Sequence, residues 1–219
     1  MNTIIFVMLL IGLLVVMIFS KERRWKVGLV VLVLTVSALF VMGFRFTAGS
    51  VLPIGSEVIR TIDTDYGKAV LYEDSTDTTF GLAEVNRTLG LLYYYGGGTN
   101  AYSAEEGVPF QAAGFGNDES FMVGIRTNDP SIKYIVIGSH LEDLKEMENK
   151  AFSMDNVKKH PDSYIVQEVK EQYVFLVLDE YSYSTWTFRA IDENEKLIGE
   201  KLYGDGDARY VEESEGQAP

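Results

Sequence analysis

Residues 120–137 read SFMVGIRTNDPSIKYIVI, and this stretch contains the pattern that decides the fold. Two short apolar runs, 120–126 and 132–137, lie on either side of the sequence NDPS. Runs of this length bounded by turn residues are typical of β-strands. The proline, whose φ is fixed at about −65°, suits the turn between them. The stretch therefore predicts two strands joined by a turn.

The same pattern recurs on both sides of this stretch, with turn sequences such as DTDYG and DENEK between the runs. The further runs are 57–62, 68–73, 79–86, 89–95, 164–169, 173–178, 185–191 and 196–203. Short strands at this spacing predict a β-sandwich or a partly open barrel. One segment differs: in 139–150, SHLEDLKEMENK, Ser139 and Glu142 have the capping-box spacing. It predicts one amphipathic helix packed on the sheets.

The N-terminus contains two apolar runs without charge, residues 3–19 and 27–44. A helix rises about 1.5 Å per residue, so each run would reach about 25–27 Å, close to the roughly 30 Å hydrocarbon core of a bilayer. Helices that are apolar on every face need a large protein to bury them, which disfavours two soluble core helices. A cleaved signal peptide is disfavoured because no basic residue precedes the first run. The pattern predicts transmembrane helices at about 3–20 and 26–44.

Four basic residues lie between these runs, Lys21, Arg23, Arg24 and Lys26. Short loops rich in lysine and arginine are typically cytoplasmic. The prediction is therefore a multi-pass protein of the cell membrane, with the lipid bilayer as a partner, a cytoplasmic loop at 21–25 and the C-terminal domain outside. The expected organisation is a transmembrane hairpin at 1–44, a tether at 45–56, a β-rich extracytoplasmic domain at 57–204 and an acidic flexible tail at 205–219.

Composition restricts the kinds of function. The chain of 219 residues has no cysteine, two histidines and a net charge of −13. The absence of cysteine excludes disulfides and thiolate metal sites. The negative charge argues against a nucleic-acid partner, because phosphate groups would be repelled. Asp63 and Asp65 lie in a sequence that fails the spacing of a calcium-binding loop, so they predict a turn. No cofactor and no metal site is predicted.

Several of these segments together resemble a known kind of protein. GVPFQAAGF at 107–115, the stretch at 120–137 and TWTFRAIDENEKLIGEKLY at 185–203 are similar to external domains of small membrane-anchored proteins from low-GC Gram-positive bacteria. The resemblance implies an anchored extracytoplasmic domain and a bacterial cell envelope. It implies no particular activity and no site residues. The chain departs from the pattern in its two apolar runs and in the acidic insert between 139 and 163.

Two aromatic clusters are the candidate ligand-binding segments. YYYGGGTNAY at 93–102 predicts a glycine-rich loop flanked by tyrosines, and DEYSYSTW at 179–186 contains a second cluster. Aromatic faces near acids suit sugars, peptides or cationic groups. The alternative is that these rings belong to the core or to cross-strand pairs. The candidate residues are Tyr93, Tyr94, Tyr95, Tyr102, Tyr181, Tyr183 and Trp186.

The sequence contains no G-x-S-x-G or H-E-x-x-H motif, so no catalytic residue is predicted. The favoured function is a noncatalytic binding module with a membrane or envelope protein as partner. One alternative is a hydrolase that uses carboxylates in an aromatic-rimmed cleft. Such an enzyme needs two acids in one pocket, at least one with a raised pKa. The other alternative is an accessory subunit of a membrane complex.

Overall fold

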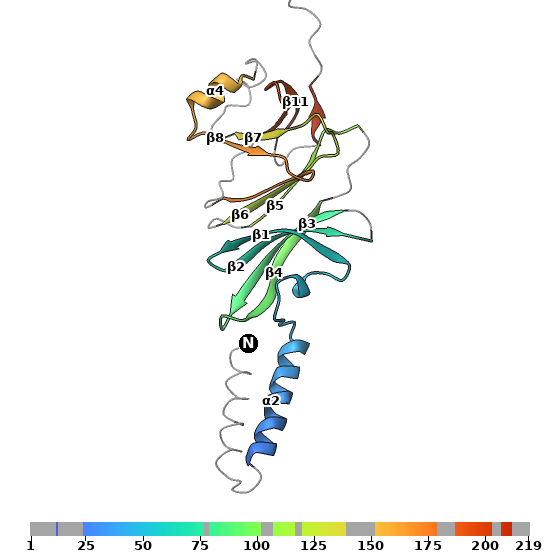
Figure 1. Cartoon of the computed structure of the whole chain (residues 1–219), viewed down its shortest axis with the longest axis vertical. Coiled ribbons are helices and arrows are strands. Elements are labelled where there is room, and N and C mark those ends of the chain that lie inside the picture. The colour runs from blue at the N-terminus through green and yellow to red at the C-terminus, as the bar shows by residue number, and fades with distance from the viewer. Residues whose placement is uncertain are drawn as a thin grey trace, which may run out of the picture.

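The computed structural model describes residue 12 and residues 24–76, 79–101, 107–116, 120–138, 152–178, 187–202 and 207–211 (Figure 1). Within these ranges the chain is mainly β. The helical elements are α2 (Arg24–Val41), the 3-10 helix η1 (Gly49–Val51) and α4 (Met154–Lys159). The strands are β1 (Ser56–Thr64), β2 (Gly67–Asp74), β3 (Phe80–Thr88), β4 (Leu92–Ala101), β5 (Gln111–Gly116), β6 (Phe121–Arg126), β7 (Tyr134–Gly138), β8 (Tyr164–Glu168), β9 (Tyr173–Leu178), β10 (Thr187–Ile191), β11 (Leu197–Leu202) and β12 (Arg209–Tyr210).

The strands form three antiparallel sheets that stack as layers (Figure 1). Sheet A is a meander in the order β1-β2-β3-β4, sheet B has the order β5-β6-β9, and sheet C has the order β12-β11-β10-β7-β8. Sheet B lies in the middle. One of its faces packs on sheet A and the other packs on sheet C, so the molecule has two cores, one on each side of β6.

Strand β6 explains why residues 121–126 have no polar alternation. Phe121, Val123 and Ile125 face sheet C, whereas Met122 and Gly124 face sheet A. A strand that is buried on both faces has an almost continuous apolar sequence. Gly124 allows the two layers to approach closely, because a Cβ atom there would lie 2.7 Å from the Leu82 side chain of β3.

Both outer faces of the stack are also covered. On the outer face of sheet A, the segment around η1 packs Leu52 against Val70 and Tyr72. On the outer face of sheet C, Val157 of α4 packs against Val136. The predicted tether at 45–56 is therefore a docked segment of the fold, because its apolar side chains cover sheet A.

The prediction of two transmembrane helices is wrong, and so are the multi-pass localisation and the orientation derived from it. Across the residues that the structure describes, no helix has both the length and the apolar character that crossing a membrane requires. α2 begins at Arg24 and has Lys26 in its first turn. Its uncharged part is thus 27–41, which rises only about 22 Å against a core of about 30 Å. Of the first predicted span, only Gly12 is described.

Each of the ten sequence runs predicted as strands overlaps an observed strand. Two strands were missed, β5 and β12. β12 pairs with β11 through Arg209 and Tyr210, so this part of the predicted flexible tail at 205–219 belongs to sheet C. The helix predicted at 139–150 lies outside the described residues.

Candidate functional site at the β3–β4 hairpin

The triple glycine is part of strand β4, Leu92–Ala101, so the prediction of a loop at these glycines is wrong. β4 pairs with β3 on both sides of Gly96, where the register shifts and forms a bulge. A Cβ atom at Gly96 would lie 2.2 Å from the side-chain Nδ2 of Asn86, and one at Gly98 would lie 2.3 Å from the backbone carbonyl oxygen of Leu82. Gly98 thus allows close backbone approach within the sheet, and Gly96 leaves room for the Asn86 side chain.

The structure brings three of the seven candidate aromatic residues together, but on two faces of sheet A. Tyr93 packs on the outer face with the cluster under η1. Tyr95 pairs with Val85 of that cluster and shares the face. Tyr94 points to the opposite face and makes an edge-on contact with Phe44 at a ring-centre distance of 5.4 Å. The remaining candidates, Tyr102, Tyr181, Tyr183 and Trp186, lie outside the described residues.

Tyr94 and Tyr95 are exposed at 38% and 42%, whereas Tyr93 is half-buried. Tyr93 is held by Arg87, whose guanidinium lies 5.9 Å from the centre of its ring. The accessible part of the tyrosine triplet therefore consists of Tyr94 and Tyr95, one on each face of the hairpin.

The turn of the same hairpin presents two leucines to solvent. Leu89 and Leu91 are exposed at 66% and 55%, and Gly90 lies between them. Leu89 has a φ of 52° and Gly90 a φ of 73°, both in the left-handed region. Arg87 holds the turn by donating from Nε to the Gly90 carbonyl at 2.8 Å. Sequence reasoning placed 89–95 in a strand and missed this tip, although a glycine between leucines signalled a turn.

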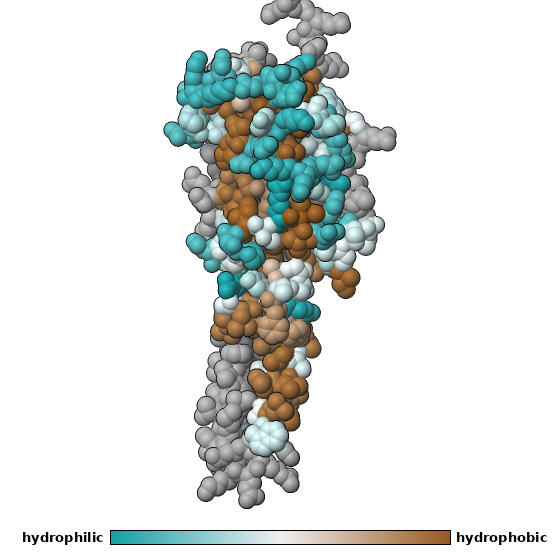
Figure 2. Space-filling view, viewed as in Figure 1, coloured by the Kyte–Doolittle hydropathy of each residue, from teal (hydrophilic) through white to brown (hydrophobic). Residues whose placement is uncertain are grey.

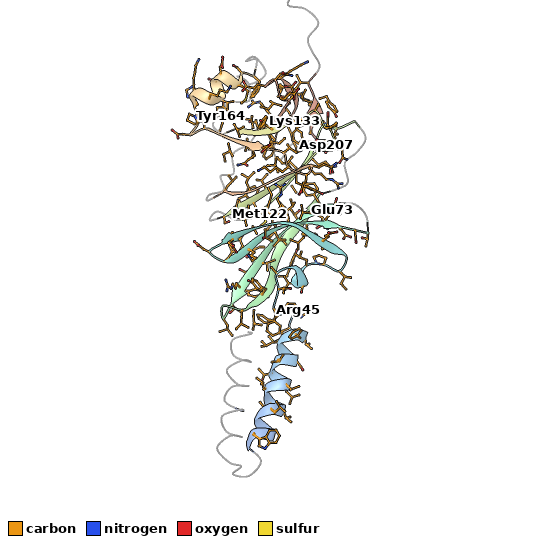
Figure 3. The ribbon with its side chains drawn as sticks, viewed as in Figure 1. Arg45, Glu73, Met122, Lys133, Tyr164 and Asp207 are labelled. Atoms are coloured by element: carbon orange, nitrogen blue, oxygen red, sulfur yellow. The ribbon has the colours of Figure 1, made fainter. Side chains whose placement is uncertain are left out.

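Arg45 joins α2 to the edge of β4 (Figure 3). Its backbone exchanges two hydrogen bonds with Tyr93, each 2.8 Å long. Its guanidinium donates to the carbonyls of Phe40 at 2.6 Å and Phe44 at 2.8 Å, and lies over the Phe40 ring. A cation at a helix C-terminus satisfies free carbonyls and the helix dipole. Apolar side chains line α2 and gather where it meets sheet A (Figure 2).

A buried tyrosine connects this site to the middle of sheet A. Tyr72 donates its hydroxyl to Asn100 Oδ1 at 2.5 Å, and its ring lies over Gly81. Burial raises the pKa of Tyr72 to about 12, and the neighbouring Tyr95 and Asp74 contribute in the same direction. The Tyr72 hydroxyl therefore stays protonated and fixes the side-chain amide of Asn100 in β4.

A second polar cluster lies between sheets A and B, where Figure 3 labels Glu73. Tyr173 donates to Glu73 Oε1 at 2.9 Å, and Arg126 approaches the same oxygen at 3.1 Å. The Arg126 guanidinium also lies over the Tyr173 ring. Burial and the hydrogen bond to Glu73 raise the pKa of Tyr173, while Arg126 opposes the shift. The three groups contact one another and tie β2 to β6 and β9.

The pKa values of three described carboxyl groups are displaced, all downward. A hydrogen bond and the charge of Lys68 lower the pKa of Asp63. Burial alone would raise the pKa of Asp129, but hydrogen bonds from Ser131 and Tyr210 outweigh it. Backbone N–H groups of Lys196 and Asn194 lower the pKa of Asp192. Each of these carboxylates accepts hydrogen bonds, Asp63 near the end of β1 and the other two in turns, and no group of three metal-binding side chains occurs among the described residues.

The two buried tyrosines predict a loss of stability at alkaline pH. Their hydroxyl groups hold protons more firmly in the folded chain than in the unfolded chain, where the pKa is about 10. Their contribution is therefore complete below about pH 10 and is lost as the pH rises toward the folded values. We expect the free energy of unfolding in urea to fall above about pH 10, and to fall less steeply in Tyr72→Phe. If the free energy of unfolding falls with pH equally steeply in Tyr72→Phe, the Tyr72 hydroxyl does not contribute to this loss.

Comparison with known proteins gives no relative: no family model, no curated protein and no solved structure matches the chain. The site must therefore be interpreted from its own geometry. That geometry is a paired hairpin with an apolar tip, an exposed tyrosine on each face and Arg45 bridged to its edge.

Proposed function

We propose that the chain is a noncatalytic binding module that engages a protein partner through the tip and both faces of the β3–β4 hairpin, a surface called the hairpin patch and defined as Leu89, Leu91, Tyr94 and Tyr95. The observation that carries the proposal is the tip, where Leu89 is exposed at 66% with a φ of 52°. For a residue with a side chain, the left-handed conformation costs roughly 1–2 kcal/mol. Asparagine or glycine would lower this cost and would also suit solvent better.

An exposed leucine in an unfavourable backbone conformation serves neither the turn nor the core. Exposed apolar side chains that gather in one place mark interaction surfaces. Tyr94 and Tyr95 add large rings with polar tips, which are frequent anchors in protein interfaces. Within the hairpin, β4 is held by its pairing with β3, and the turn is held by the Arg87 hydrogen bond to Gly90. Little conformational entropy is therefore lost on binding.

The hydrolase alternative is less well supported. General acid catalysis by a carboxyl group needs a raised pKa. Among the described residues, the carboxyl groups with a displaced pKa have it lowered and lie at a strand end or in turns: Asp63, Asp129 and Asp192. The hairpin patch itself is apolar and aromatic, which suits recognition.

The proposal is tested with a photoreactive side chain at position 91, which we expect to crosslink one protein of defined mass in cells. Leu89→Asn should remove this adduct, because the tip loses its apolar side chain. The same variant should keep or raise the melting temperature, because asparagine tolerates the left-handed conformation. Position 166 on β8, where Val166 is 43% exposed, is the matched control and should give no such adduct. An adduct that persists in Leu89→Asn would contradict the proposal.

A further inference from the structure

The way in which the partner binds can be inferred from the edge of sheet A. This inference rests on the proposed function. We propose that β4 receives its partner as an added antiparallel strand, and that the incoming segment is extended, with a basic residue between aromatic ones. Strand addition combines backbone hydrogen bonds for affinity with side-chain contacts for specificity.

β4 is the last strand of sheet A, and its outer edge is only partly used. Among the described residues, Arg45 alone pairs with that edge, through its bridge to Tyr93. After Arg45 the chain turns away and passes under sheet A, where Leu52 is buried. Beyond the bulge at Gly96, residues Gly97–Ala101 continue in regular register with β3. This part of β4 offers its outward backbone groups to a further strand.

The segment around Arg45 shows what the edge accepts. Phe44 contacts Tyr94 edge-on, Arg45 forms an antiparallel bridge with two hydrogen bonds of 2.8 Å, and its guanidinium lies 5.4 Å from the Phe40 ring centre. An aromatic residue followed by a basic residue is thus already seated at the start of β4. A partner with the same alternation would extend this arrangement over Tyr95 and toward Asn100.

The two edges of sheet A differ in how well they are protected against pairing with a strand of another chain. β1, at the other edge, has a register shift between Val58 and Arg60 and carries charged side chains. Arg60 is engaged with the Lys170 carbonyl of the turn before β9. Irregularity and charge on an edge strand discourage pairing with other chains. β4 has the sequence LYYYGGGTNA, without charge or proline, and among the described residues no charged side chain guards the edge at Gly97–Ala101, although Phe115 of β5 packs on Gly97.

Charge favours a basic occupant. The whole chain carries a net charge of −13, and the exposed rings of Tyr94 and Tyr95 stand beside the edge, while Arg45 and Arg87 are both engaged at Tyr93. Arginine or lysine over a tyrosine face gains a cation–π contact, and opposite overall charge increases the association rate. An acidic segment would lose both contributions.

The test uses the isotopically labelled full-length chain and a blocked peptide of sequence Thr-Phe-Arg-Phe-Thr-Arg-Thr. We expect the peptide to shift the backbone amide signals of Gly97–Ala101 and to slow their hydrogen exchange. Two variants of the peptide are N-methylated on alternate residues, one set on each side. Strand addition requires that one set abolishes binding and that the other leaves it nearly unchanged, because only alternate residues face β4.

Side-chain contacts are tested separately. Tyr95→Ala should weaken peptide binding roughly fivefold, as expected for loss of one cation–π contact. Tyr134→Ala on β7, at a similarly exposed tyrosine, should not change it. A peptide with glutamate in place of arginine should bind more weakly than the parent peptide.

Besides failure of the peptide to bind, two results would overturn the inference. One is equal binding of both N-methylated peptides, which would mean that backbone pairing plays no part. The other is binding of the chain to phosphatidylcholine–phosphatidylglycerol vesicles with no response to any peptide, which would assign the patch to lipid. Failure of the peptide with the position 91 crosslink intact refutes strand addition alone. If the position 91 adduct persists in Leu89→Asn, or the same adduct forms at position 166, the proposed function is refuted as well.

Discussion

Replacing Gly67 with alanine is expected to lower the free energy of unfolding by about 3 kcal/mol or more. Gly67 begins β2 after the hairpin turn and has a φ of 146°. A Cβ atom there would lie 2.3 Å from the Val85 carbonyl oxygen and 2.8 Å from the Arg87 amide nitrogen. Both neighbours are backbone atoms of β3, so relief requires β2 and β3 to separate. Chemical denaturation in urea measures the loss.

Gly90 is the matched control for this substitution. It also has a positive φ, 73°, but no atom lies within 4 Å of its ideal Cβ position. Gly90→Ala should therefore cost only the conformational strain, about 1 kcal/mol. The difference between the stability losses of the two variants measures the effect of the close approach of β2 and β3. Equal losses would show that the backbone at Gly67 adapts freely.

Replacing Phe188 with alanine should cost about 3–5 kcal/mol, as for other fully buried aromatic residues. Phe188 lies on β10 with no exposed surface and packs in the core between sheets B and C. The cavity cannot close readily, because Ile135, Ile137 and Val123 around it belong to paired strands. The exposed Val166→Ala on β8 is the control and should change stability by less than about 0.5 kcal/mol.

Phe188 also tests whether the layers unfold together. Phe80 occupies the other core, between sheets A and B, and makes an edge-on contact with Tyr173. Because β6 and β9 contribute to both cores, Phe188→Ala and Phe80→Ala should each lower a single common transition. Two separate transitions, each sensitive to one variant, would mean that the layers are independent units.

The strands were predictable because their apolar runs are short and bounded by turn residues. Phe121–Arg126 is the clearest case, although its sequence alone did not reveal that both of its faces are buried. β5 has the sequence QAAGFG, whose alanines and glycines have low strand propensity. It forms because Gln111–Gly116 pair along the full length of β6. Here tertiary pairing outweighs local preference.

The candidate site was predicted only in part. Tyr93–Tyr95 were identified, but the glycines after them suggested a loop because their role in close strand packing depends on Asn86 and Leu82 of the neighbouring strand. The leucine tip was missed because Leu89 has no intrinsic preference for a positive φ. The length of the uncharged run at 27–44 suggested a span, but the helix begins at Arg24 and ends at Val41.

The composition of the central layer has a consequence for the order of assembly. Sheet A consists of one continuous stretch, Ser56–Ala101, so its pairings are local and inexpensive in loop-closure entropy. β6 pairs with β9, and Phe121 opposes Leu178. On the ribosome, β6 therefore waits for most of the remaining chain before its second edge is covered. A nascent chain arrested before Tyr173 would expose this strand, and aggregation is the expected fate of such a fragment.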